Sequence, residues 1–379
     1  MTMVDAGTDR EHAPGKKRVI ILGGGFCGTK VARELADDFS VTLIDSKDFF
    51  EFTPGILRSI VEPSHAQKLQ APYERIIDHA RFVKGTVRDV TSSQVNVDGR
   101  AFSFDYLVIS LGSSYEAPFK EQDVILSSRA KNLQKAHQRC EEANTLLVIG
   151  GGIVGIEMTG ELCDHYQDRK ITLCHGGNRL MPRLPEKARE YALHVLQKSG
   201  VKIILNEYVT EQKDEGFYTR TGNNIPADVA FLCTGIRPNS RALRKHLADI
   251  LDGQGRVKVD EHLQVRGQAH MFAGGDITDI KEEKLAQSAE QHAEIICKNI
   301  RLLEQGQQEK LMAYRPKKRP MVISMGKRQG IFVWGRLVMT GIIPALLKPL
   351  VEWKAMWKFR RGADRTKTLR SGKHAGNIT

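Results

Sequence analysis

The chain alternates short, wholly apolar runs with segments in which apolar residues recur at helical spacing. The first apolar run covers residues 18–22, a helix-like segment follows over residues 29–36, and a second apolar run covers residues 41–44. Short continuous apolar runs are typical of strands buried on both faces, and the segment between them is typical of a helix that crosses over a parallel sheet. The pattern therefore predicts an α/β protein.

A glycine-rich stretch joins the first apolar run to the predicted helix. Gly23 would permit the tight turn, Gly25 would let the backbone approach a pyrophosphate, and Gly28 would let the helix pack closely on the strand. The helix N-terminus presents unpaired N–H groups to phosphates. Asp45, which ends the second apolar run, would hold the ribose hydroxyls. A purely structural turn is the alternative, but the strand before the glycines and the acid after them favour a dinucleotide-binding βαβ unit.

The same pattern occurs a second time, over residues 146–157. Gly150, Gly152 and Gly155 repeat the glycine spacing, and residues 170–174 supply the following apolar strand. A whole strand, turn and helix pattern is duplicated by chance far less often than one glycine motif occurs alone. The repetition therefore predicts two dinucleotide sites.

The second unit departs from the first at the position that would contact the ribose. His175 stands where an acid normally binds the 2′-hydroxyl, and Arg179 follows shortly after it. Without a carboxylate there, the site would not repel a 2′-phosphate, so we expect it to accept NADPH as well as NADH. A histidine that only caps the strand is the alternative.

Three later apolar strands end in residues that suit a cofactor. Gly112 ends the first of them and would let the chain pass near a bound group, and Gly235 ends the second in the same way. The third ends in two glycines and Asp276, ahead of a segment with helical spacing. An acid at that place is suited to binding sugar or ribityl hydroxyls, and a helix N-cap is the alternative.

The segment after Asp45 is aromatic and contains a proline. It covers residues 49–58 and includes Pro54, and Lys47 lies just before it. It would form either a wall for a flavin ring or a hydrophobic turn that packs on the sheet. Lys47 and Pro54 are therefore further candidates for cofactor contact.

Composition and charge narrow the class of protein. The 379 residues, of which 41% are hydrophobic, suffice for about two or three domains with their own cores. The formal charge of +12 favours anionic partners, whether a dinucleotide, a nucleic acid or a membrane surface. The six cysteines lie far apart without a Cys-x-x-Cys pair, which suits a reducing compartment and argues against a redox-active dithiol or a zinc site. No metal site is predicted.

Taken in this order, the two glycine motifs and the strand ends at Gly235 and Asp276 resemble the two-dinucleotide-binding-domain flavoproteins. The resemblance covers about residues 17–300. It implies that the first unit binds FAD and the second a nicotinamide nucleotide. Disulfide reductases of this superfamily carry a cysteine pair after the first helix, whereas residues 45–59 here contain none. The chain is thus similar to the cysteine-free branch, which includes the type II NADH dehydrogenases and the apoptosis-inducing-factor group.

Later segments extend the resemblance, within the apoptosis-inducing-factor group, to NAD(P)H-dependent ubiquinone reductases over nearly the whole chain. These segments are residues 260–265, 313–316, 324–326, 335–337 and 352–356. The resemblance implies hydride transfer from the nicotinamide to the flavin, followed by transfer of two electrons to a membrane quinone. It also implies that Glu157 faces the nicotinamide and the flavin, and that Lys354 lies near the quinone, where a cation would stabilise negative charge. A first-turn helix acid and a solvated basic face are the alternatives for these two residues.

The C-terminal part interleaves apolar and aromatic residues with lysines and arginines over residues 337–361. Its longest uncharged run, residues 337–347, is far shorter than the roughly 20 residues that a spanning helix needs. We expect the segment to lie in a membrane interface, with its basic residues toward lipid phosphates. A helical hairpin that closes the third domain on its own core, or contact with a second subunit in a homodimer, is the alternative.

The expected fold is α/β, with two Rossmann-like dinucleotide-binding domains and a smaller α+β C-terminal domain. The predicted parts are a flexible leader (1–16), an FAD domain (17–120 and 240–285), an NAD(P)H domain (121–239), a C-terminal domain (286–362) and a flexible tail (363–379). The leader has no apolar segment and does not resemble a signal peptide, which predicts a cytoplasmic protein at a membrane surface. Within this fold, the alternatives to quinone reduction are a protein acceptor or a nucleic-acid-binding signalling role.

Overall fold

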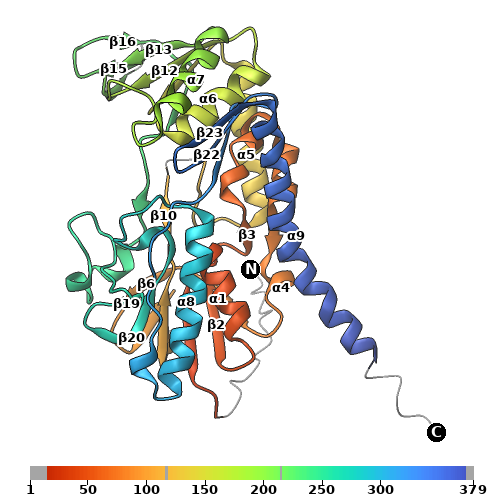
Figure 1. The fold of residues 1–379 in the computed structure, drawn as a ribbon, viewed down its shortest axis with the longest axis vertical. Coiled ribbons are helices and arrows are strands. Elements are labelled where there is room, and N and C mark those ends of the chain that lie inside the picture. The colour runs from red at the N-terminus through yellow and green to blue at the C-terminus, as the bar shows by residue number, and fades with distance from the viewer. Residues whose placement is uncertain (1–14, 116–117, 214–215, 373–379) are drawn as a thin grey trace, which may run out of the picture.

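The computed structural model describes residues 15–115, 118–213 and 216–372, with only the backbone described at 358 and 361–372. Most of the predicted leader and the end of the predicted tail, residues 373–379, therefore lie outside the described residues. Two α/β units stand end to end, and one long helix lies alongside both of them (Figure 1). The predicted α/β fold with two Rossmann-like sheets is confirmed.

The first unit is built on a six-stranded sheet with β1 near its centre. Parallel neighbours flank β1 on both sides, and its apolar side chains are almost fully buried, which explains the continuous apolar run. In spatial order the strands are β19 (Gln264–Val265), β20 (Gln268–Ala273), β9 (Tyr106–Ile109), β1 (Arg18–Leu22), β2 (Ser40–Asp45) and β5 (Arg81–Lys84). Helices α1 (Phe26–Leu35) and α8 (Ala286–Glu304) pack against each other beside this sheet.

The second unit is inserted into the first and has a four-stranded parallel sheet. Its spatial order is β13 (Lys202–Leu205), β12 (Lys170–His175), β11 (Thr145–Ile149) and β17 (Val229–Leu232). Its helices are α5 (Leu126–Glu142), α6 (Ile153–His165) and α7 (Glu186–Lys198), and a small antiparallel sheet adds β14 (Val209–Lys213), β15 (Gly216–Thr219) and β16 (Asn224–Ile225). The repeated glycine motif thus corresponds to a repeated strand, turn and helix.

Two short strands connect the units where the chain leaves the first and returns to it. Strand β10 (Ser113–Ser114) pairs with β18 (Arg237–Pro238) in antiparallel fashion. Gly112, just before this crossing, has a φ of +64°, and its carbonyl accepts a hydrogen bond of 3.1 Å from the backbone N–H of Asn239. The outgoing and returning segments are therefore held together at one junction.

Small elements complete the first unit. They are β3 (Phe49–Glu51), η1 (Thr53–Gly55), α2 (Arg58–Val61), η2 (Pro63–His65), α3 (Ala66–Leu69), β4 (Gln70–Pro72), α4 (Tyr73–Ile76), β6 (Val87–Val90), β7 (Gln94–Val97), β8 (Arg100–Ser103), η3 (Arg241–Leu243), η4 (Ala248–Ile250) and η5 (Gly275–Ile277). The aromatic segment that begins at β3 belongs to the core, because Phe49 and Phe50 are completely buried. Their burial fits the interpretation of this segment as a packed hydrophobic turn.

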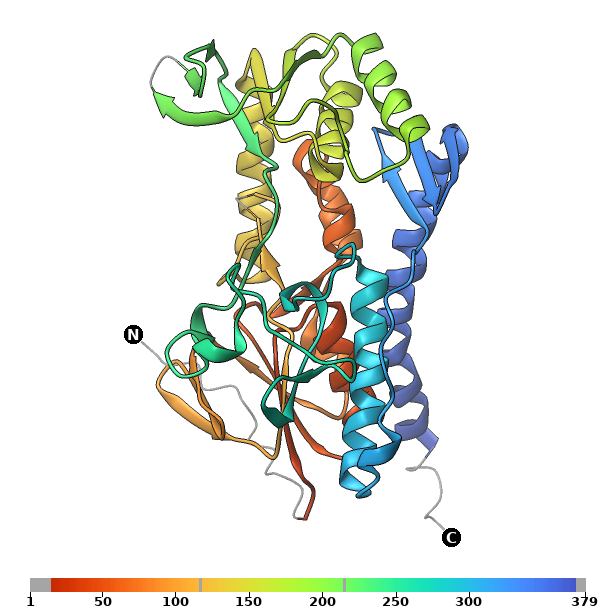
Figure 2. The same ribbon diagram turned by 60° about the vertical axis from the view of Figure 1, so that its left-hand side comes forward.

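The C-terminal part forms a three-stranded antiparallel sheet followed by the long helix. After η6 (Gln308–Lys310), the strands are β21 (Met321–Ser324), β22 (Gly330–Trp334) and β23 (Leu337–Gly341), and α9 (Ile342–Gly372) follows directly. The segment considered as a helical hairpin is thus a strand and a single helix, and α9 ends inside the predicted tail. Figure 2 shows α9 beside both units. Across the described residues, no helix combines the length and apolarity needed to cross a bilayer.

The three glycines of the first turn differ in the space around them. A Cβ on Gly28 would overlap the carbonyl oxygen of Gly23, so the glycine lets α1 approach β1 closely. A Cβ on Gly25 would meet no atom within 4 Å, and its φ of −71° suits any residue. Gly28 is therefore needed by the fold itself, while the space beside Gly25 is open for a ligand.

We predict that the variants Gly28→Ala and Gly25→Ala separate stability from cofactor binding. Gly28→Ala should lower the thermal midpoint of the apoprotein, because overpacking a tight contact costs about 1–3 kcal/mol. Gly25→Ala should keep that midpoint and weaken FAD binding, because the new methyl group occupies the approach to the pyrophosphate. Thermal unfolding of apoprotein and FAD titration measure the two effects, and equal loss of stability in both variants would contradict this assignment.

Candidate active site

The first candidate site lies at the carboxyl ends of β1 and β2, where open parallel sheets bind ligands. Asp45 Oδ2 accepts a hydrogen bond of 2.6 Å from the N–H of Gly24, and its Oδ1 accepts one of 2.8 Å from the N–H of Lys47. The Lys47 ammonium lies over the ring of Phe49, 5.4 Å from its centre. The structure thus brings Asp45 and Lys47 to the glycine turn.

Asp276 lies in η5, just after the end of β20. Its carboxylate accepts hydrogen bonds from Ser113 Oγ at 2.6 Å and from Lys120 Nζ at 3.1 Å. Burial alone would raise the pKa of Asp276, but Lys120 and the Ser113 hydroxyl outweigh burial and lower it, so the group is ionised at neutral pH. Helix α8 begins only at Ala286, so Asp276 does not cap that helix.

Pro54 lies at the edge of the first unit, toward α9. It is an exposed residue of η1, and a Cβ on the next residue, Gly55, would come within 2.7 Å of a Glu352 carboxylate oxygen. The proline segment and the long helix therefore contact each other. This contact links the predicted flavin side of the molecule to its C-terminal part.

A cavity of about 400 Å³ lies at the second glycine turn, within the size range of small-molecule sites. Its lining includes Gly150, Gly152, His175, Arg183, Tyr208 and Gly235. Arg179 is exposed and is not among the lining residues, whereas Arg183 is, and its Nε lies 3.1 Å from Glu283 Oε1. The arginine nearest this cavity is thus not the one that the sequence pattern indicated.

His175 is one of the residues that line this cavity. The N–H of Gly151 donates to His175 Nδ1 at 3.1 Å, which leaves the ring proton on Nε2. Burial lowers the pKa of His175, so the ring is neutral at pH 7. The histidine therefore holds the glycine turn, and a backbone hydrogen bond with Arg179 opposes the effect of burial on its pKa.

Glu157 is buried on α6 beside a lysine of α9. Its Oε1 accepts a hydrogen bond of 3.0 Å from the N–H of Ser324 in β21, and it forms an ion pair with Lys348. Burial raises the pKa of Glu157, although the Lys348 ammonium and the Ser324 N–H act in the opposite direction. Glu157 lies beyond the first turn of α6, which holds no acid, so the alternative of a first-turn helix acid does not apply. Lys354, the predicted cation of this helix, is exposed instead.

Two further pairs of ionisable groups lie close to Glu157. Arg58 of α2 binds Glu161 of α6 through two hydrogen bonds of 3.0 and 3.1 Å. His65 Nε2 lies 3.2 Å from Glu352 Oε2, and both side chains are more than nine-tenths buried. The first pair joins the two α/β units, and the second joins α9 to the first unit. Charged contacts thus fix α9, α6 and the α2 segment relative to one another.

Helix α9 is amphipathic in an unusual sense, because two charged residues face inward and apolar residues face outward. Its buried face carries Ala345, Lys348, Glu352, Met356 and Phe359. Its exposed apolar residues are Ile342, Ile343, Leu346, Leu350, Val351, Trp353 and Trp357. Lys348 pairs with Glu157, and Glu352 interacts with the Arg58 guanidinium, so burial does not leave either charge without an opposite one.

Analysis of the sequence did not identify Lys348, Ser324 or the pair of Arg58 with Glu161. A weak signal exists in the helical spacing of residues 345, 348, 352, 356 and 359, which places a lysine and a glutamate on one face. That spacing gave no indication that this face was buried, because the neighbouring face is more apolar. The burial of this face is explained only by the partners that α6 and η2 supply to Lys348 and Glu352.

The fold carries two dinucleotide-binding glycine turns, which is the arrangement of a dinucleotide-dependent oxidoreductase. The chain belongs to the pyridine nucleotide-disulphide oxidoreductase family, whose model matches residues 17–293. The predicted resemblance is confirmed. Apoptosis-inducing factor homolog B of Dictyostelium discoideum is 32% identical over 344 residues, which cover 83% of this chain and 89% of that protein. Human ferroptosis suppressor protein 1 is 30% identical over 368 residues, which cover 90% and 96% of the two chains.

Solved structures show the same fold at lower identity. The complex of NDH2 from Plasmodium falciparum with NADH has a TM-score of 0.78 at 16% identity and covers 92% of this chain and 96% of its own. The sulfide:quinone oxidoreductase of Aquifex aeolicus has a TM-score of 0.77 at 18% identity, covering 91% and 92%. Despite the family name, residues 45–59 contain no cysteine, and all six cysteines of this chain are free thiols.

We predict that Lys348→Met destabilises the protein in a pH-dependent way, with Lys354→Met as the matched control. Without the cation, the pKa of Glu157 rises further above its unfolded value of about 4.3. The folded variant then holds a proton that the unfolded chain releases, so the loss of stability grows as the pH rises above that value. Removing one partner of a buried pair costs about 3–5 kcal/mol at neutral pH.

Denaturant midpoints at pH 5 and pH 8 measure this effect. The deficit of Lys348→Met relative to the unmodified protein should be larger at pH 8, whereas Lys354→Met should match the unmodified protein at both values because Lys354 is exposed. If the deficit were the same at both pH values, the stability of the variant would not depend on the protonation of Glu157.

Proposed function

We propose that the protein is an FAD-dependent NAD(P)H:quinone oxidoreductase that works at a membrane surface. The observation that carries this proposal is α9, which turns Lys348 toward Glu157 and turns Leu350 and Trp353 outward. One helix thus joins the buried charged site to an apolar outer face. An apolar quinone dissolved in a membrane is the acceptor that such a face suits.

The first site fits FAD. The open space at Gly25 lies at the N-terminus of α1, where free N–H groups favour a pyrophosphate. Asp45 and Asp276 supply carboxylates for the ribose and the ribityl chain, and the positive φ of Gly112 shapes the neighbouring strand end. When bound there, FAD accepts a hydride from a nicotinamide nucleotide and passes two electrons to an acceptor.

The second crevice fits a nicotinamide nucleotide. A Cβ on Gly152 would meet no atom within 4 Å, whereas one on Gly155 would overlap the carbonyl oxygen of Gly150, so this turn repeats the division of roles seen in the first. His175 lines this crevice and accepts a hydrogen bond from the N–H of Gly151 in its glycine turn. The absence of a carboxylate at this position supports use of both NADH and NADPH.

The buried pair supplies a fixed charge near the reacting groups. Lys348 holds a positive charge in a site from which water is largely excluded, and Glu157 keeps that charge in place. A preorganised cation of this kind stabilises negative charge that develops during reduction. Lys354, beside Trp353 on the outer face, is proposed as the cation on the quinone side.

The outer face of α9 is proposed to bind the membrane peripherally, from the cytoplasm. Leu350 and Trp353 are 59% and 63% exposed, and the rings of Trp353 and Trp357 stack 5.9 Å apart. The preceding hairpin of β22 and β23 adds exposed Trp334 and Leu337. Apolar residues of this kind next to basic side chains favour the interface of an anionic bilayer. A second copy of the chain is the competing occupant.

We predict rapid NAD(P)H oxidation when FAD-loaded protein is given a soluble short-chain quinone. Gly152→Ala should raise the KM for NADH while FAD content stays unchanged, because the methyl group would occupy only the second crevice. Steady-state absorbance at 340 nm, with both nucleotides, measures the rates. If no quinone stimulated NAD(P)H oxidation and a protein acceptor were reduced rapidly, the electron acceptor would be that protein and not a quinone.

We predict that the protein co-sediments with anionic liposomes and that Leu350→Ser combined with Trp353→Ser abolishes this binding. Both side chains are exposed, so the double variant should keep its thermal midpoint and its activity with a soluble quinone. Ile125→Ser, which removes a 37% exposed apolar side chain far from α9 in the sequence, serves as the matched control. Unchanged sedimentation of the double variant would show that the outer face of α9 does not bind the membrane. If the substitutions instead converted a dimer to a monomer without liposomes, the face would bind a second copy of the chain.

A further inference from the structure

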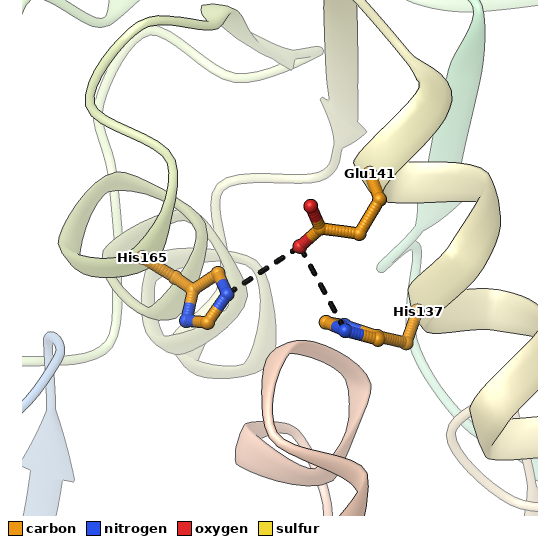
Figure 3. Close-up of side chains that lie close together, drawn as sticks. All are labelled: His137, Glu141 and His165. Atoms are coloured by element: carbon orange, nitrogen blue, oxygen red, sulfur yellow. Dashed lines mark ion pairs between the residues drawn. The ribbon is translucent and has the colours of Figure 1, made fainter.

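Three side chains with metal-binding atoms meet at the surface of the second unit, away from the sites described above. His137 and Glu141 come from α5 and His165 from the end of α6, and Figure 3 shows both histidine rings beside the same carboxylate. Glu141 Oε1 lies 3.7 Å from His137 Nε2 and 3.6 Å from His165 Nε2. One donor atom from each residue lies within 4.8 Å of the other two. Among the described residues, this is the one such group.

Secondary structure places these atoms together. His137 and Glu141 are one helical turn apart on α5, so they share a face of that helix. His165 is the last residue of α6, and its ring lies 5.9 Å from that of His137. The side chains of His137, Glu141 and His165 are 26%, 47% and 36% exposed, so an ion from solvent can reach all three.

The ring of His137 is already oriented as a ligand. Its Nδ1 lies 3.2 Å from the carbonyl oxygen of Ile60 in α2, and a carbonyl can only accept a hydrogen bond. Nδ1 therefore donates to this carbonyl, and Nε2 lies on the side of Glu141. The hydroxyl of Tyr166 also lies 3.3 Å from Nδ1. A backbone carbonyl behind a histidine is the usual means by which proteins orient a metal ligand.

The distances suit an ion better than direct hydrogen bonds. At 3.6 and 3.7 Å, the nitrogen and oxygen atoms are too far apart for a hydrogen bond. Tetrahedral zinc with bonds of about 2.0–2.2 Å separates its ligand atoms by roughly 3.3–3.5 Å. The two distances to Glu141 thus exceed ligand spacing by only a few tenths of an ångström, whereas the histidine donor atoms, which lie within 4.8 Å of each other, would close by up to roughly 1.5 Å through side-chain rotation.

We propose that His137, Glu141 and His165 form a binding site for a divalent transition metal of the zinc class. Two imidazoles and one carboxylate are a known ligand set for zinc, with water in the fourth position. The ion would tie α5 to α6 and, through the Ile60 carbonyl, both helices to α2 of the first unit. The same α2 carries Arg58, which binds Glu161 of α6 at 3.0 Å. The ion would therefore brace the junction between the two units.

The site is tested by titrating tag-free, FAD-loaded protein with Zn²⁺ in a calorimeter and with Co²⁺ in a spectrophotometer. We expect one Zn²⁺ per chain, visible absorption bands from bound Co²⁺, and a higher thermal midpoint with Zn²⁺. Affinity should fall when the pH is lowered from 7.5 to 5.5, because protons compete with the metal for the imidazole nitrogens.

Variants decide whether the three residues hold the ion. His165→Ala and Glu141→Gln should each weaken Zn²⁺ binding by at least about tenfold, since even loss of a hydrogen bond behind a ligand costs roughly 10–100-fold. The control is His194→Ala, which removes an exposed histidine of α7 and should bind as the unmodified protein does. Thermal midpoints without metal verify folding.

Either of two results would overturn the proposal. The first is Zn²⁺ binding by His165→Ala and Glu141→Gln with unchanged affinity, which would place the ion elsewhere. The second is the absence of saturable binding by the unmodified protein, which would leave the group as an ordinary set of exposed polar side chains.

Discussion

The structure depends on keeping two opposite charges, Glu157 and Lys348, buried together. Taking a charge out of water costs several kcal/mol unless a partner and hydrogen bonds compensate it. Here the carboxylate comes from the second unit, the ammonium from α9, and one hydrogen bond from the N–H of Ser324 in β21. The pair therefore couples the docking of the C-terminal part to the charge state of the candidate site.

This coupling explains the orientation of α9. The helix is held against both units by its charged side, through Lys348 and Glu352, and by the ring of Phe359, which lies 4.2 Å from that of Phe50. Its most apolar side is left outward, which would be unfavourable for a helix that had only solvent beside it. A membrane or a second subunit would resolve this conflict, and a membrane also supplies the proposed quinone.

Much of the fold could be predicted because its signals are local. A buried parallel strand is a continuous apolar run, and a phosphate-binding turn needs glycines at fixed spacing. Asp98 followed by Gly99 is likewise a local turn signal, and both residues have positive φ in the hairpin between β7 and β8. The repeated unit could be recognised for the same reason.

The contacts that could not be predicted join residues distant in the sequence. Lys354 fits the family pattern, yet Lys348 is the lysine beside Glu157, because the rotation of α9 is set by its partners. Arg183 rather than Arg179 reaches the second cavity for a similar reason. His165 follows Glu141 without any recognisable metal motif, and only the packing of α6 beside α5 reveals their proximity.

The most direct test of the account is the rate at which NADH reduces the bound flavin, followed by stopped-flow absorbance in the absence of quinone. If the buried cation stabilises the charge that develops during reduction, Lys348→Met should slow this step by about 100-fold. Lys354→Met should reduce the flavin at the unmodified rate and slow only its reoxidation by quinone. Flavin reduction at the unmodified rate in Lys348→Met would contradict the central role given to the buried pair.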